Sequence, residues 1–213
     1  MTTVTTLGFP RIGAKRELKA ALESYWRGDT TADDLQRTAR DLRHCHWQLQ
    51  RDAGADVVPC NDFALYDHVL DTAFLFDAIP DAYRTLADAD PLAGYFALAR
   101  GVQRDGTDLR ALEMTKWFDT NYHYLVPELH ARQDFRLRGD KPVAEFLEAR
   151  AAGHAARPVL LGPVSFLLLA KTVDGSDRLA LLDRLLPVYA DLLAKLHDAG
   201  ADWVQIDEPC LVL

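Results

Sequence analysis

The stretch Pro158-Val-Leu-Leu-Gly-Pro163 predicts a short buried strand that ends in a sharp turn. An amphipathic segment precedes it at residues 141–153, and a longer one follows at residues 177–200. Short apolar runs that alternate with longer amphipathic runs are typical of βα units, whose consecutive strands run parallel. This part of the chain therefore predicts an α/β fold in which helices cover the faces of a parallel sheet.

The same alternation extends in both directions from this stretch. Further strands are predicted at residues 4–9, 56–60, 121–126 and 203–206. Further helices are predicted at residues 14–27, 31–54 and 63–76, and Pro187 is expected to kink or split the helix that begins at Asp177. About five βα units are visible, whereas a closed (β/α)8 barrel needs eight strands and about 250 residues. The pattern predicts either an open sheet or a TIM-type barrel that stops after its fifth strand.

Composition limits the partners and the compartment. The 213 residues carry a formal net charge of −8, which argues against nucleic acid or an anionic membrane as the main partner. The three cysteines have no spacing typical of disulfides or zinc, so we expect reduced thiols in a cytoplasmic protein. The N-terminus does not resemble a signal peptide, and the most apolar stretch is interrupted by Gly162-Pro163.

A basic cluster stands out in this acidic chain, directly after Gly8-Phe-Pro-Arg-Ile-Gly13. Lys15, Arg16 and Lys19 are spaced three and four apart, which predicts one stripe near a helix N-terminus. Cations beside free backbone N–H groups suit a ligand rich in carboxylates or phosphates. The alternative is an ordinary solvated helix face.

Two other segments carry candidate binding residues. Asp207-Glu208 follows a predicted strand, where one carboxylate could face a ligand or form a structural salt bridge. Lys116 lies among aromatic residues in segment 113–124, which suits either a flat anionic molecule or core packing.

Metal and nucleotide motifs are not found. His44-Cys45-His46 has residues two apart on a predicted helix, which do not face one ligand, so we expect no metal site there. The sequence holds no phosphate-binding Walker loop, no nucleophile elbow and no dinucleotide-binding glycine pattern.

Together these segments resemble the N-terminal region of cobalamin-independent methionine synthase. They occur in the order of that family and span the chain, although residues 80–106 match less well. The matching stretches are Thr6-Leu-Gly-Phe-Pro-Arg-Ile-Gly13, Arg16-Glu-Leu-Lys19, Ser24-Tyr-Trp26, Asp62-Phe-Ala-Leu-Tyr-Asp-His-Val-Leu70, Glu113-Met-Thr-Lys-Trp-Phe118, Thr120-Asn-Tyr-His-Tyr124, Pro158-Val-Leu-Leu-Gly-Pro-Val164 and Trp203-Val-Gln-Ile-Asp-Glu-Pro209.

The resemblance implies a methyltransferase that transfers a methyl group from 5-methyltetrahydropteroyltri-L-glutamate to L-homocysteine, forming methionine without cobalamin. It implies two tandem barrels, of which the first binds folate without a metal and the second holds zinc and homocysteine. Residues 1–213 would be the first barrel, cut off before closure, with no catalytic residue and no metal ligand of their own. The implied folate contacts are Arg16, Glu17, Leu18, Lys19 and Lys116, with Asp207 as a weaker candidate by internal duplication.

The resemblance further implies that this chain is inactive by itself, because the zinc ligands and the homocysteine pocket would lie in the missing C-terminal half. Two alternatives stay open. One is a non-catalytic folate-binding or assembly module. The other is a barrel of the uroporphyrinogen decarboxylase type, against which segment 113–124 argues.

Overall fold

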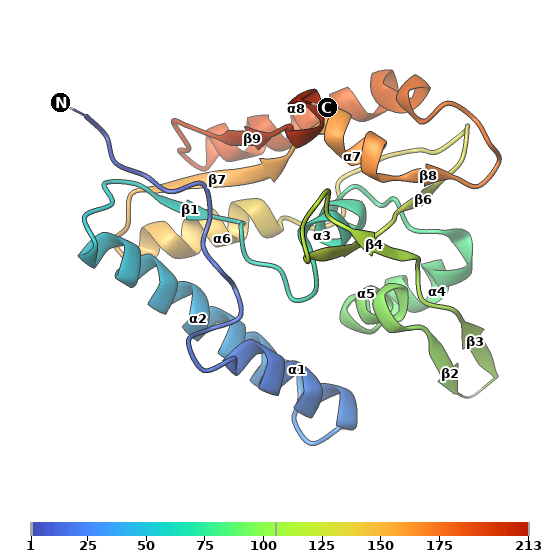
Figure 1. Cartoon of the computed structure of the whole chain (residues 1–213), viewed down its shortest axis with the longest axis horizontal. Coiled ribbons are helices and arrows are strands. Elements are labelled where there is room, and N and C mark those ends of the chain that lie inside the picture. Colours follow the sequence, from blue (N-terminus) through green and yellow to red (C-terminus); the bar gives the residue numbers. More distant parts are fainter. Residues whose placement is uncertain (1, 105, 213) are drawn as a thin grey trace. The chain divides into compact units, whose positions relative to one another are not determined.

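The chain divides into two compact units in the computed structural model, which describes residues 2–104 and 106–212. Figure 1 labels helices and strands of both units. Leu213, where we expected the barrel to be cut off, lies outside the described residues. The first unit comprises Met1–Leu65, Lys141–Leu160 and Lys195–Gln205. The second comprises Tyr66–Asp140, Leu161–Ala194 and Ile206–Leu213. Each unit is described by itself.

The first unit is built from helices and a parallel pair of strands. Its complete elements are α1 (Glu17–Arg27), α2 (Ala32–Asp52), β1 (Val58–Cys60) and α6 (Lys141–Ala151). The strand β7 (Ala156–Leu161) pairs parallel with β1 in the register Val58↔Ala156, within the sheet order β1-β7-β9. This confirms the predicted α/β class with a parallel sheet.

Local signals fix the helices of the first unit. Thr31 and Asp34 form a capping box at the start of α2, so two backbone N–H groups of the first turn are satisfied. Gly28 ends α1 in the left-handed conformation that glycine adopts without strain. The helices then bury one apolar face each, in a core that includes the fully buried side chains of Leu18, Leu35, Val58 and Phe146.

The second unit combines short helices with several small sheets. Its helices are α3 (His68–Leu75), α4 (Asp81–Ala89), α5 (Pro91–Arg100), α7 (Pro163–Leu169) and most of α8 (Leu182–Asp198), with 3₁₀ turns η1 (Arg178–Leu181) and η2 (Pro209–Val212). Its strands are β2 (Val102–Arg104), β3 (Thr107–Leu109), β4 (Met114–Lys116), β5 (His123–Leu125), β6 (Glu128–Leu129), β8 (Lys171–Thr172) and the end of β9 (Gln205–Asp207).

Aromatic packing and one ion cluster stabilise the second unit. The ring of Phe76 lies 4.6 Å from that of Tyr189 and 6.2 Å from that of Phe166. Asp77 is buried and accepts ion pairs from Arg84, Arg136 and Arg138 at 2.8, 2.7 and 3.1 Å. Burial acts to raise the pKa of Asp77, but the arginines outweigh it and the pKa lies below its usual range.

Several predicted elements are wrong in extent or pairing. Residues 4–9 form only an isolated bridge, Thr5↔Val57, rather than a strand. The helix predicted over 63–76 begins only at His68, because Asp67 caps it there. The strand predicted at 121–126 is β5, which pairs antiparallel with β4 instead of joining the parallel sheet. The strands β2 and β3 form a second antiparallel pair.

Pro187 lies inside the continuous helix α8, so the expected splitting of this helix does not occur. A proline removes one helical hydrogen bond, and the buried side chains of Leu185, Tyr189 and Leu192 keep the helix packed on either side of it.

Among the described residues, no helix combines the length and apolarity that a membrane span requires.

Candidate functional site

The segment that precedes α1 is fastened to the end of β1 by polar contacts. The carboxylate of Asp62 accepts the backbone N–H of Phe9 at 2.8 Å, and the Arg11 guanidinium donates to the carbonyl oxygens of Ala64 and Leu65 at 3.2 and 3.3 Å. The Phe9 ring also lies 4.7 Å from the buried ring of His46. Residues 8–13 are therefore held in place although they belong to no helix or strand.

A tight turn then presents the basic residues. Arg16 has the left-handed backbone conformation, with φ 63°, and its N–H donates to the carbonyl of Gly13 at 3.1 Å. The Glu17 carboxylate folds back and accepts the N–H of Lys15 at 2.9 Å. Gly13 has φ +85°, and a Cβ there would lie 2.2 Å from Glu17 Oε2, so the turn requires glycine.

This geometry corrects the predicted helical stripe. Lys15 and Arg16 precede the first residue of α1, so helical spacing does not describe how they lie relative to Lys19. Both side chains are exposed, and neither forms an ion pair with any residue of 2–104 or 106–212. Lys19 is half exposed and pairs with Glu23 at 3.5 Å, a contact of the weak surface kind. The turn thus presents cations that an anionic ligand could use.

Glu17 and Leu18 have different surroundings from these cations. Leu18 has 0% exposure, and its N–H donates to the carbonyl of Ile12 at 3.2 Å. Glu17 is half-buried, and its carboxylate accepts the Lys15 N–H within the turn. Their side chains shape the turn rather than extend into solvent.

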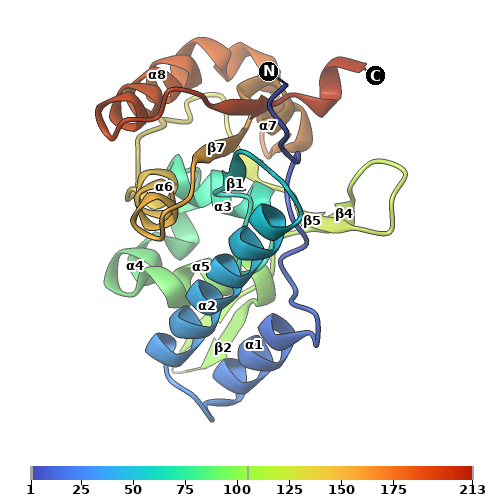
Figure 2. The same cartoon turned by 90° about the vertical axis from the view of Figure 1, so that its left-hand side faces the viewer.

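Lys116 belongs to the second unit, at the end of β4. It lies opposite His123 in the β4–β5 pair, and its exposed side chain forms no ion pair within the described part of the chain. The connecting loop extends outward in Figure 2. The rings of Trp117 and Phe118 lie 4.9 Å apart edge to face, and Tyr122 is 40% exposed. Lys116 is thus an exposed cation that directly precedes the loop carrying Trp117, Phe118 and Tyr122.

The second carboxylate of Asp207-Glu208 has a structural role. Glu208 accepts the backbone N–H groups of Val164 and Ser165 at 3.0 and 2.6 Å, at the start of α7. A Cβ at Gly162 would lie 2.2 Å from the Glu208 carboxyl carbon, so this approach depends on glycine. The backbone carbonyl of Asp207 accepts the N–H of Gly162 at 2.7 Å, which joins the ends of β7 and β9.

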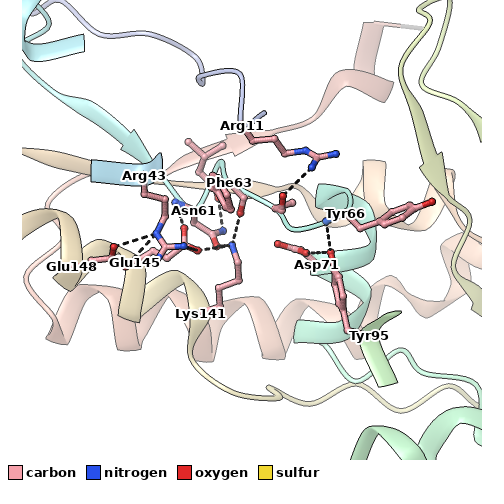
Figure 3. A network of polar contacts seen from close by, with 12 residues as sticks. Arg11, Arg43, Asn61, Phe63, Tyr66, Asp71, Tyr95, Lys141, Glu145 and Glu148 are labelled. Carbon is pink, nitrogen blue, oxygen red and sulfur yellow. Dashed lines mark hydrogen bonds and ion pairs between the residues drawn. The ribbon is translucent and has the colours of Figure 1, made fainter. Parts of the chain in front are cut away.

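Polar groups that the sequence pattern did not reveal, some half-buried and some buried, lie beside these segments. In the first unit, Lys141 donates to Asn61 Oδ1 at 3.0 Å and to the carbonyl of Phe63 at 2.8 Å, and it pairs with Glu145 at 3.1 Å (Figure 3). Asn61 has φ 60°, a conformation in which asparagine is enriched. Burial raises the pKa of Asp62 to about 6 and that of Asp67 to about 7.

The residues of His44-Cys45-His46 have separate surroundings. His44 pairs with Glu148 at 3.1 Å, Cys45 is exposed, and His46 is buried, which lowers the pKa of its ring. Within residues 2–104 and 106–212, no group of three His, Cys, Asp or Glu side chains lies so that it could hold a metal ion.

Comparison with solved structures shows which known proteins share this fold. A vitamin-B12-independent methionine synthase from Shewanella sp. W3-18-1, solved with selenomethionine, has a TM-score of 0.57, with 17% identity over 84% of this chain and 44% of its own. A structure from Listeria monocytogenes has a TM-score of 0.60, with 12% identity over 99% of this chain and 54% of its own. At these identities the likeness shows a shared α/β fold.

Sequence comparison then gives the family. Residues 3–213 match the family described as cobalamin-independent synthase, N-terminal domain, and the chain belongs to this family. A relative from Xylella fastidiosa (strain 9a5c), named 5-methyltetrahydropteroyltriglutamate–homocysteine methyltransferase, is 75% identical over the whole chain. A relative of the same name from Chelativorans sp. (strain BNC1) is 59% identical over 99% of it. The chain spans 28% of the length of each of these relatives.

Proposed function

We propose that this chain is the folate-binding part of a methyltransferase that moves a methyl group from 5-methyltetrahydropteroyltri-L-glutamate to L-homocysteine, forming methionine. The names and identities of the relatives support this assignment. Because the chain spans 28% of their length, the proposal assigns it the binding of the methyl donor and no catalytic residue. The same proposal takes its parallel sheet as part of an incomplete (β/α)8 barrel in a cytoplasmic protein.

The observation that carries the proposal is the turn at Arg16. A residue other than glycine in the left-handed region is held there at a cost, and such strain is concentrated at functional sites. The strained turn presents an exposed guanidinium with no ion pair among the described residues. A triglutamate tail offers several carboxylates, each a partner for a charge-assisted hydrogen bond.

The candidate residues would have different roles. Arg16, Lys19 and Lys116 are each proposed, separately, as a cation for a carboxylate of the tail. Glu17 and Leu18 would shape the turn, since one is held by the Lys15 N–H and the other is buried. Asp207 stays a weaker candidate, with its backbone bonded to Gly162.

Homocysteine belongs to the proposal only through the relatives' names, and zinc only through the resemblance of the sequence segments to the family. The described residues offer no ligand set for a metal, so we derive no step through zinc. Zinc activation of a homocysteine thiol would need ligands other than those in residues 2–104 and 106–212.

The test is a set of charge-removing variants in this chain, Arg16→Ala, Lys19→Ala and Lys116→Ala. Titration calorimetry would compare pteroyltriglutamate with pteroylmonoglutamate. A charge-assisted hydrogen bond contributes about 1.5–3 kcal/mol, so each variant should weaken triglutamate binding about ten- to a hundred-fold and monoglutamate binding much less. Lys195→Ala is the matched control, because Lys195 is an exposed lysine that the proposal does not use.

Two results would contradict the assignment of these residues. Equal losses for both folates would mean that the residues hold the pterin or only the fold. No loss for either folate would make the basic turn an ordinary solvated surface.

A further inference from the structure

The hairpin that carries Lys116 cannot hold itself in place. It consists of β4 and β5, two strands of three residues that pair with each other and with no other strand among the described residues. An isolated two-stranded pair is marginally stable at best in water. The position of Lys116 therefore depends on the contacts that anchor this hairpin within the second unit.

Asp67 supplies one such anchor with a carboxylate that is almost fully buried. One of its oxygens, Oδ1, accepts the N–H of Leu70 at 2.8 Å and caps α3. The other, Oδ2, accepts the N–H of Leu125 in β5 at 3.1 Å. The residue is 1% exposed, so water cannot replace either bond. A single side chain thus joins α3 to the hairpin.

The next residue makes a second contact with the same hairpin. The ring of His68 meets the ring of Trp117 at 4.5 Å, edge to face, and lies 6.3 Å from that of Tyr122. Trp117 directly follows Lys116 in the chain. The start of α3 therefore contacts the hairpin at two places. Asp67 bonds to Leu125 at the end of β5, and His68 packs on Trp117, which follows Lys116 at the end of β4.

We propose that Asp67 is a positioning residue, which fixes the β4–β5 hairpin so that Lys116 meets the carboxylates of an oligoglutamate tail. This inference rests on the proposed function, because it takes Lys116 as a tail-binding residue. Asp67 itself is too deeply buried to touch the ligand.

The surroundings of Asp67 set the conditions for a test. Burial raises its pKa to about 7, the two N–H groups oppose this, and the nearby charge of Asp71 adds to it. Asp71 in turn accepts the hydroxyl of Tyr95 at 2.5 Å, and that hydroxyl accepts the N–H of Tyr66 at 3.1 Å (Figure 3). Measurements at about pH 8 keep the Asp67 carboxylate ionised and able to accept both bonds.

The variant Asp67→Asn separates the two bonds. Its amide oxygen can still cap α3, whereas its NH₂ group would face the N–H of Leu125, donor against donor. Asp90→Asn is the matched control. Asp90 also caps a helix of the second unit, accepting the N–H of Ala93 at 3.0 Å at the start of α5, and no bond from it to the hairpin is among the contacts of the described residues.

Hydrogen exchange and binding would be measured on the same proteins. Asp67→Asn should speed amide exchange in residues 114–125 but not in α3, and Asp90→Asn should not change the hairpin. Asp67→Asn should also weaken triglutamate binding about tenfold, the effect of losing one bond to a buried charged group, and leave monoglutamate binding unchanged. In a Lys116→Ala background it should cause no further loss, as expected when two residues act through one contact.

The outcomes separate the inference from the function on which it rests. Faster exchange in α3 instead of the hairpin, or a further loss on top of Lys116→Ala, would overturn the role of Asp67. An unchanged preference for triglutamate in Lys116→Ala alone would instead contradict the proposed function at Lys116, and the exchange data would still report whether Asp67 anchors the hairpin.

Discussion

Arg16 shows what a sequence pattern can and cannot say about a single residue. Spacing and charge identified it as a candidate, but they placed it on a helical stripe. The left-handed backbone could not be predicted, since residues other than glycine rarely adopt it. In retrospect, the signal is Gly13 followed by Glu17, the pair that closes the turn.

Replacing Arg16 should separate strain from function. Arg16→Gly and Arg16→Ala both remove the guanidinium, so both should lose triglutamate affinity to the same extent. Only glycine relieves the left-handed backbone, which costs roughly 1–2 kcal/mol for other residues. In urea unfolding, Arg16→Gly should therefore be more stable than Arg16→Ala by about 1 kcal/mol. Equal stabilities would show that the turn carries no such strain.

The elements with strong local signals were predicted well. The caps at Thr31 and Gly28 fix the ends of α2 and α1, and the helix predicted at 141–153 is α6. The pairing of β5 was not predicted, because its composition suits a parallel or an antiparallel neighbour equally. Its partner is β4, only seven residues earlier in the chain.

The contact between the N-terminal segment and β1 gives a prediction on pH. Asp62 accepts the Phe9 N–H, and burial, with the Glu145 charge adding to it, raises its pKa from 3.8 to about 6. Between these pH values the folded chain binds more protons than the unfolded chain. The contribution of Asp62 to the free energy of unfolding is therefore fully present below pH 3.8, and it is lost as the pH rises to about 6.

Asp62→Asn keeps an acceptor for Phe9 but removes the titration. The free energy of unfolding of the native chain, relative to that of Asp62→Asn, should therefore fall between about pH 4 and pH 6. Denaturant unfolding at several pH values measures this difference, in which other titrating groups cancel. A difference that stays constant or grows with pH would be inconsistent with a raised pKa at Asp62.

At the scale of the whole molecule, the α/β class followed from the alternation of runs. The basic candidate residues followed from charge and spacing, and the resemblance added Glu17 and Leu18 and the folate as ligand. The buried carboxylates of Asp62 and Asp67 were missed, because they look like ordinary loop residues until long-range packing buries them. Burial of a carboxylate depends on segments far apart in the sequence, such as β5 over Asp67. A local sequence pattern therefore does not indicate which carboxylates are buried.

The candidate residues belong to two different units of the chain. Arg16 and Lys19 belong to the first unit and Lys116 to the second, so each is tested by its own variant. The chain spans 28% of the length of its named relatives, so we propose for it only the capture of the methyl donor. Binding can be measured without any requirement for catalysis.

The most direct measurement is the affinity of the unmodified chain for pteroyltriglutamate and for pteroylmonoglutamate, at low and high salt. We expect the triglutamate to bind at least about ten times more tightly at low salt, since each charge-assisted bond to the tail contributes about 1.5–3 kcal/mol. This preference should shrink at high salt, because the cations are exposed. Equal affinity for the two folates at low salt would contradict the central claim.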